Sequence, residues 1–377
     1  MDAIIAIVSY ILICVLFLYM VKYERGIRFV YGRKTDDPAI ERKHFVIYMW
    51  PLLTAFLFCF YNKFITGVQS RLTGDRMNYY IDFIYERSTG FVFFDKFLQI
   101  VKSVTTDFSI LLALVTLICC FFMFLAICLS KYCSIEAILF LSASYFVFVT
   151  LTALKQSPVC ALAALMFVLL IERKGIIYDI FAILIIIVSS CLHSTGFMLI
   201  PLYLLLKLNY KNKMRTTVMM IILVIAFVFF QPAAQFVSTR FANVIPIFGE
   251  RVSGYLANEI TVDAGDKSGF IILKGIPYYI LAVIGLVDRK LHADNPHYDK
   301  YLILSVIGAI SALMSIYSYW YIRITYVFFL PFYILFSMIM SKRKGKDRII
   351  LIVLIIGSLA FFTFRSVILN YVNYGGY

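Results

Sequence analysis

The chain has 377 residues, of which 62% are hydrophobic and 15% charged, and its formal net charge is +14. Soluble globular domains contain about 45–50% apolar and about 25% charged residues, so this composition excludes an ordinary soluble protein. The apolar residues form long continuous runs, which predicts an all-α, polytopic integral membrane bundle. We expect the positive charge to face lipid headgroups, with the bilayer and not nucleic acid as the partner.

Apolar runs long enough for helices recur along the whole chain. A bilayer core of about 30 Å takes roughly 20 apolar residues per helix, which allows about 12 transmembrane helices here. We therefore predict a single transmembrane domain over residues 1–377. The predicted spans are 3–21, 44–61, 108–130, 135–153, 157–171, 176–192, 194–207, 216–231, 269–287, 301–317, 324–341 and 349–364.

The apolar run 176–207 is too long for one crossing, so we divide it at the polar stretch 191–196. Basic residues then fall mainly in alternate gaps between spans, as expected for cytoplasmic loops. This alternation predicts a multi-pass protein with both termini outside. The basic gaps hold the cations of 22–43, then Lys131, Arg173 with Lys174, those of 207–215, those of 289–300 and those of 342–348.

Two predicted external connections, 62–107 and 232–268, are much longer than connections usually are. In the first, residues 79–85 and 91–98 combine aromatic with polar side chains. This pattern is typical of short amphipathic helices that lie at the membrane interface. The second connection carries two arginines, Arg240 and Arg251.

The cations on the predicted external side are the residues that topology does not explain. A solvated or snorkelling side chain is the simple interpretation of each one alone. As a set they could bind a multiply anionic group, because Arg offers a planar fork for phosphate and Lys a point charge. Pyrophosphate is the candidate ligand. The set comprises Arg76, Lys155, Arg240, Arg251 and Arg323.

Asp75 and His193 are the candidate catalytic residues on the same side. Asp75 could cap a helix, or its carboxylate could accept a proton from a sugar hydroxyl. His193 could be a structural residue at a helix end, or a proton acceptor. The candidate ligands for sugar hydroxyls are Tyr79, Asn78, Gln156 and Tyr326. The sequence contains no recognisable cofactor or metal-binding motif, so we expect neither a metal nor a cofactor.

Taken in order, the external motifs resemble the EpsG-like branch of the Wzy-type polysaccharide polymerases. The family usually has Arg-Gln where this chain has Lys155-Gln156, and Lys keeps the charge but lacks the bidentate fork. The resemblance covers roughly residues 70 to 330. It is carried by Gly74, Asp75 and Tyr79; by Tyr85, Glu86, Gly90 and Phe91; by Lys155 and Gln156; by His193, Ser194, Pro201 and Tyr203; and by Arg323 and Tyr326.

The resemblance implies a membrane glycosyltransferase that polymerises undecaprenyl-pyrophosphate-linked oligosaccharide repeat units at the outer face of the bacterial inner membrane. The product would be O-antigen, capsule or exopolysaccharide. The implied partners are the lipid-linked donor and acceptor glycans, with a chain-length regulator as a further candidate.

A lipid-linked oligosaccharide flippase or another transporter is an alternative, as are an O-antigen ligase and a membrane O-acetyltransferase. A transporter is expected to carry polar residues near mid-membrane, whereas the obvious polar residues of this chain cluster at the outer edge. Lys274, within about one to two turns of the start of its span, is the main exception. An acetyltransferase would instead have its catalytic residues toward the cytoplasm. A ligase shares the donor chemistry, so the sequence separates it poorly from a polymerase.

Overall fold

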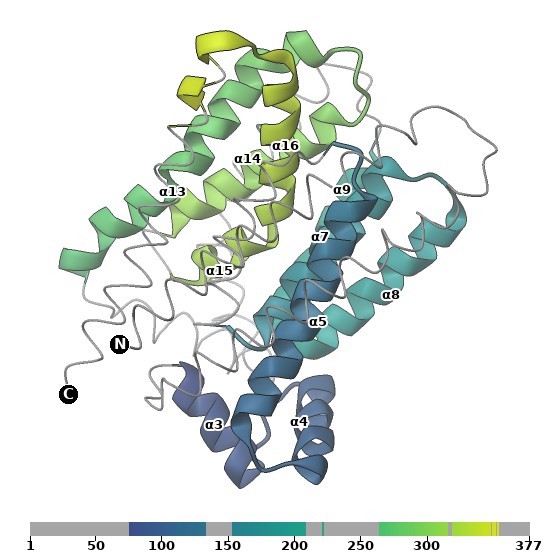
Figure 1. The fold of residues 1–377 in the computed structure, drawn as a ribbon, viewed down its shortest axis with the longest axis vertical. Helices are drawn as coiled ribbons and strands as arrows, with labels where there is room; N and C mark the ends of the chain where they lie inside the picture. The colour runs from purple at the N-terminus through teal and green to yellow at the C-terminus, as the bar shows by residue number, and fades with distance from the viewer. Residues whose placement is uncertain are drawn as a thin grey trace, which may run out of the picture. The chain divides into compact units, whose positions relative to one another are not determined.

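The computed structural model describes residues 75–132, 153–208, 221, 264–315, 319–347, 349–351 and 353. All secondary structure within these residues is helical, as the composition predicts. The chain divides into two compact units, Met1–Leu206 with Leu359–Tyr377, and Lys207–Ser358. Each unit is considered by itself below, and Figure 1 shows the helices of both.

The predicted amphipathic stretches of the first unit are the helices α3 (Asp75–Tyr85) and α4 (Val92–Val104). In α4 the buried side chains Phe94, Leu98 and Val101 follow the spacing of a single helix face. Lys102 joins the two helices, because its Nζ lies 2.8 Å from Glu86 Oε1 and donates to the carbonyl oxygen of Ile84 at 2.7 Å. We refer to α3 and α4 together as the α3–α4 hairpin.

Helix α7 (Gln156–Glu172) is the centre of the first unit, and every one of its side chains is buried. It packs against both α5 (Phe108–Leu129) and α8 (Ile176–Leu192). These three helices agree closely with the predicted spans. Within the described residues, Phe108–Ile127 of α5 is the segment long and apolar enough to cross a membrane.

At the end of α7 that we predict to be cytoplasmic, the buried carboxylate of Glu172 accepts two hydrogen bonds. They come from Ser130 Oγ at 2.8 Å and from the backbone N–H of Lys131 at 2.6 Å. Arg173 donates to the carbonyl oxygen of Leu129 at 3.3 Å. The basic gaps after α5 and after α7 therefore meet at one end, as the alternating charge pattern requires.

The division of the apolar run 176–207 is confirmed. Helix α8 ends at Leu192, His193 is extended, and the 3₁₀ turn η1 (Ser194–Met198) leads into α9 (Leu199–Lys207). A Cβ atom at Gly196 would meet the backbone of Ser189 and Ser190. Only glycine allows η1 to fold back this closely onto the end of α8.

The second unit contains α13 (Ala264–Val287), the 3₁₀ turn η2 (Asp288–His292), α14 (Tyr298–Met314), α15 (Tyr319–Val327) and α16 (Phe329–Lys342). Helix α14 packs against α13, α15 and α16. Helix α13 begins before the predicted span, inside the segment 232–268 that we expected to be a loop. An apolar pattern marks only the part of a helix in an apolar environment, so it misses such a polar first turn.

The prediction of a single span over 324–341 is wrong in one respect, because α15 and α16 are separate helices. The break falls at Phe328, whose φ of −96° and ψ of 8° are not helical. Pro331 has no N–H with which to bond the carbonyl group of Val327, so a continuous helix would lose a hydrogen bond here. In α16 the proline instead lies in the first turn, where the missing N–H costs little.

Two bidentate ion pairs hold one end of the second unit together. Arg343 contacts both carboxylate oxygens of Asp288, with a shortest distance of 2.9 Å, and Arg289 contacts those of Asp299 at 2.8 and 2.9 Å. Both arginines come from gaps that we predict to be cytoplasmic. As in the first unit, the gaps assigned to one side of the membrane meet at one end of the helices.

Replacing Arg343 with Met should destabilise the protein by about 3 kcal/mol, because it leaves the buried carboxylate of Asp288 without its cation. The measurement is thermal unfolding of the purified protein in detergent. Lys344→Met is the matched control, since Lys344 is exposed and adjacent. Equal unfolding temperatures for the two variants would contradict a stabilising role for the Arg343–Asp288 pair.

Candidate functional site

Side chains from three separate parts of the first unit meet around Lys155, the residue that directly precedes α7. Its Nζ lies 4.0 Å from Asp82 Oδ2 and 5.0 Å from the centre of the Tyr79 ring. The rings of Phe94 and Phe91 follow at 5.8 and 5.9 Å. The ammonium group is thus surrounded by aromatic faces and one carboxylate, which together offset the cost of its partial burial.

His193 joins this group through Phe91, because the two rings stack with centres 5.5 Å apart and planes at 21°. We refer to the side chains Tyr79, Asp82, Phe91, Phe94, Asp95, Lys155 and His193 as the Lys155 cluster. Its members come from α3, α4, the start of α7 and the end of α8, all at the side of the unit that we predict to be external. The first four motifs of the predicted ordered set therefore converge.

The hydrogen bonds of His193 define which nitrogen carries its proton. The backbone N–H of Thr195 donates to Nδ1 at 3.2 Å, and the Thr195 hydroxyl lies 3.0 Å from the same nitrogen. Because Nδ1 is an acceptor, the neutral ring carries its proton on Nε2. His193 is therefore the cap of η1, and in this state its ring is a donor through Nε2 and not a proton acceptor.

The two carboxylates near Lys155 have opposite pKa shifts. Burial raises the pKa of Asp82, and the positive charges of Lys155 and Arg87 offset this only in part. Burial also acts to raise the pKa of Asp95, but hydrogen bonds from Thr89 and Ser88 outweigh it and hold the pKa below its usual value. Two similar groups in one cluster thus differ in how readily each takes up a proton.

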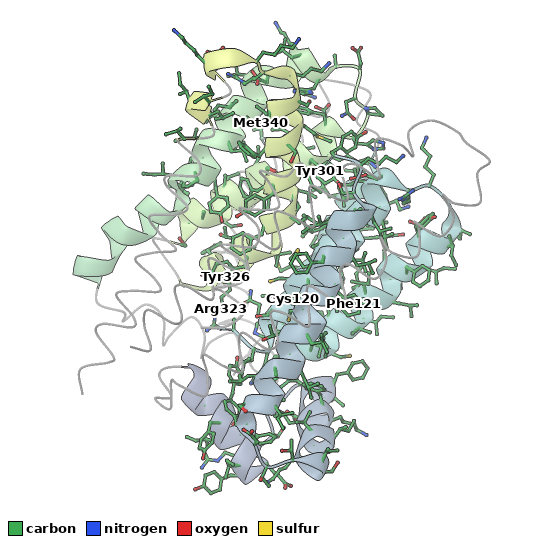
Figure 2. The ribbon with its side chains drawn as sticks, viewed as in Figure 1. Cys120, Phe121, Tyr301, Arg323, Tyr326 and Met340 are labelled. Carbon is green, nitrogen blue, oxygen red and sulfur yellow. The ribbon has the colours of Figure 1, made fainter. Side chains whose placement is uncertain are left out.

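The other sequence-predicted residues have more varied positions. Asn78 is exposed on α3, whereas Gln156 is buried, only 2% exposed, at the first position of α7. Arg323 and Tyr326 lie on α15 of the second unit, where Figure 2 labels them, and the Tyr326 ring packs against Phe329 at 5.2 Å.

The remaining predicted site residues are described only in part or not at all. The backbone of Asp75 and Arg76 forms the start of α3. Arg240 and Arg251 lie outside the described residues, as does most of the second long connection. The roles that we assign to these four residues in pyrophosphate binding and catalysis stay predictions.

The sequence motifs do not single out three members of the cluster, Asp82, Phe94 and Asp95. A usable signal was present on α3. Tyr79 and Asp82 are three residues apart, so they lie on the same face of the helix. A carboxylate on the same helix face as Tyr79 can be detected from the sequence. Its pairing with Lys155 cannot, because the two residues are far apart in the chain.

The first unit contains apolar helices, and a cation, two carboxylates and an imidazole gather at one end of them. This arrangement is typical of a helical membrane protein with a polar site at its helix ends. The chain belongs to the EpsG family, whose family model matches residues 50–376. This membership confirms the resemblance drawn from the external motifs, and it indicates a polymerase-type role in membrane polysaccharide biosynthesis. No curated protein and no solved structure matched the chain.

Replacing Lys155 with Met should loosen the α3–α4 hairpin by about 1–2 kcal/mol, because the methionine keeps the apolar stem but removes the cation from the three rings. Lys155→Arg should preserve the attachment, since a guanidinium group also stacks on aromatic faces. Hydrogen exchange of α3 and α4 measures the effect. Lys96→Met, an exposed change on α4, serves as the control and should leave exchange unchanged.

Replacing His193 with Ala should lower stability by about 1 kcal/mol through loss of the cap on η1, whereas His193→Asn should retain most of it. Asparagine supplies a side-chain acceptor for the same backbone N–H but has no imidazole. Thermal unfolding separates the two variants. If His193→Ala is as stable as the wild type, the capping role is wrong.

Proposed function

We propose that this protein polymerises lipid-linked oligosaccharide repeat units at the outer face of the bacterial inner membrane, using undecaprenyl pyrophosphate as the leaving group. The observation that carries the proposal is the convergence of Tyr79, Phe91, Lys155 and His193 in one polar cluster. Family membership supplies the class of reaction. The cluster supplies groups of the kinds that such a reaction requires.

The proposed reaction joins the growing glycan to the non-reducing end of a new repeat unit. A hydroxyl oxygen of the acceptor attacks the anomeric carbon of the donor, and a new glycosidic bond forms. The bond from that carbon to the pyrophosphate oxygen breaks, and its electron pair leaves with undecaprenyl pyrophosphate. The hydroxyl proton passes to a basic group of the protein.

Cations are needed because negative charge develops on the leaving pyrophosphate during this step. Lys155 is one candidate, and Arg76, Arg240, Arg251 and Arg323 complete the proposed set. Fixed positive groups that face the developing charge lower the barrier without being consumed. Because Nδ1 of His193 accepts the Thr195 N–H, the proton of the neutral ring lies on Nε2, and this Nε2–H is a proposed hydrogen-bond donor to a phosphate oxygen.

Polar residues at helix ends also bear on the alternatives. A transporter needs polar groups along a path through the membrane. On α7 and the residue before it, the charged groups with described contacts lie at the two ends of the helix, Lys155 at one and Glu172 at the other. The α7 residues between Gln156 and Glu172 are apolar apart from Ser157, whose hydroxyl donates to the carbonyl group of Ala153. This distribution favours a reaction at one face over transport.

Deletion of the gene in the producing bacterium distinguishes the proposed functions. A polymerase defect should leave surface glycan that carries a single repeat unit, which gel electrophoresis of surface polysaccharide detects. Expression of the wild-type chain, or of the Lys96→Met control, should restore long chains.

Other outcomes of the deletion have other meanings. Loss of all surface glycan with repeat units retained inside the cell would identify a flippase. Accumulation of long lipid-linked polymer that fails to reach its final acceptor would identify a ligase. Either result would contradict the polymerase proposal.

A further inference from the structure

The two carboxylates beside Lys155 are held in different ways. Asp95 accepts hydrogen bonds from Ser88 Oγ at 2.7 Å, from the backbone N–H of Thr89 at 2.8 Å and from the Thr89 hydroxyl. Among the described residues, the carboxylate of Asp82 has no hydrogen-bond donor of this kind. Its nearest charged partner is Lys155 Nζ, at 4.0 Å.

This difference decides which group can take up a proton. Three donors stabilise the charged form of Asp95, and a proton would have to displace at least one of them. Asp82 is only 18% exposed and has a loose ion pair, so protonation disrupts little in its surroundings. The other charges that act on Asp82 are the cation of Arg87 and the carboxylate of Asp95.

The position of Asp82 along α3 acts in the same direction. Helix α3 runs from Asp75 to Tyr85, so Asp75 is its first residue and Asp82 lies in its last turn. The positive end of the helix dipole stabilises an anion near the N-terminus, whereas the negative end destabilises one near the C-terminus. Of the two aspartates on this helix, Asp82 is therefore the more basic by position.

We infer that Asp82 is the proton acceptor of the proposed transfer, and that its protonation releases the charge of Lys155 toward the leaving pyrophosphate. This inference rests on the proposed function. Before the reaction, the carboxylate of Asp82 balances Lys155. When the acceptor hydroxyl gives its proton to Asp82, that negative charge disappears as a new one develops on the pyrophosphate. The positive charge of Lys155 is then no longer balanced by Asp82, and it stabilises the leaving pyrophosphate.

His193, a candidate proton acceptor by its titration range, has a different role in this mechanism. Nδ1 of His193 already accepts a hydrogen bond from the backbone N–H of Thr195, and Nε2 carries the proton of the neutral ring. Neither ring nitrogen is therefore available to accept a proton from the substrate. His193 therefore serves as a donor, and Asp82 as the base. A chain of three contacts links the two residues. His193 stacks on Phe91, the Phe91 ring lies 5.9 Å from Lys155 Nζ, and Lys155 pairs with Asp82.

The test uses membrane vesicles of the producing bacterium, which contain its own lipid-linked repeat units. Chain extension is measured as a function of pH for the wild type and for Asp82→Asn. The wild-type rate should fall as pH is lowered through the pKa of Asp82, which burial raises above the usual value of an aspartate, because only the ionised carboxylate accepts a proton. Asp82→Asn should be about 10²- to 10⁴-fold slower and should lack this acid limb.

Two further variants separate chemistry from structure. Asp82→Glu should recover part of the rate together with the acid limb, which a purely structural carboxylate would not require. Asp294→Asn, an exposed change on the loop before α14, should behave as the wild type. Asp95→Asn should keep the acid limb even where it lowers the amount of folded protein.

An Asp82→Asn variant with the wild-type rate and acid limb would overturn the inference and leave the proposed function intact. Loss of the acid limb in Asp95→Asn would also overturn the inference, because it would identify Asp95 and not Asp82 as the proton acceptor. Absence of chain extension in wild-type vesicles would instead contradict the proposed function itself.

Discussion

The contacts of the Lys155 ammonium group are the interaction on which the α3–α4 end of the first unit depends. Lys155 directly precedes α7, whose side chains are buried along its whole length, so its position is set by the packed centre of the unit. Three aromatic rings and the carboxylate of Asp82 close around it, and all of them belong to the α3–α4 hairpin or its loop. One cation thereby attaches the α3–α4 hairpin to the helical core.

The same constraint explains where polar contacts occur elsewhere. An unpaired polar group is costly inside an apolar bundle, so polar side chains gather at helix ends with their partners. At the opposite end of α7, Glu172 is held by Ser130 and Lys131, and in the second unit Asp288 is held by Arg343. These contacts join helices, whereas the Lys155 cluster also brings together groups that differ in charge and basicity.

Lysine suits its position in one respect better than the arginine that the family resemblance leads us to expect. A compact ammonium group can lie among three rings and still respond to the charge of a neighbouring carboxylate. The proposed mechanism uses that response, because Lys155 is neutralised by Asp82 at rest and becomes available as Asp82 takes up a proton. A bidentate guanidinium group would hold the carboxylate more firmly and make it a weaker base.

The sequence alone predicted the helical class, the bounds of α5, α7 and α8 and the break near His193, because these depend on local hydrophobicity and on glycine and polar residues at turns. It also identified Tyr79, Lys155 and His193 as candidates from their motifs. Only the tertiary structure showed that Asp82 faces Lys155, that Asp95 is occupied by Ser88 and Thr89, and that Thr195 determines the tautomer of His193. The Asp82–Lys155 pair joins α3 to α7 across a long stretch of chain, and the packing of helices brings the two side chains within reach. The contacts of Asp95 and His193 are short in sequence, but they depend on the backbone conformation of the loop before α4 and of η1.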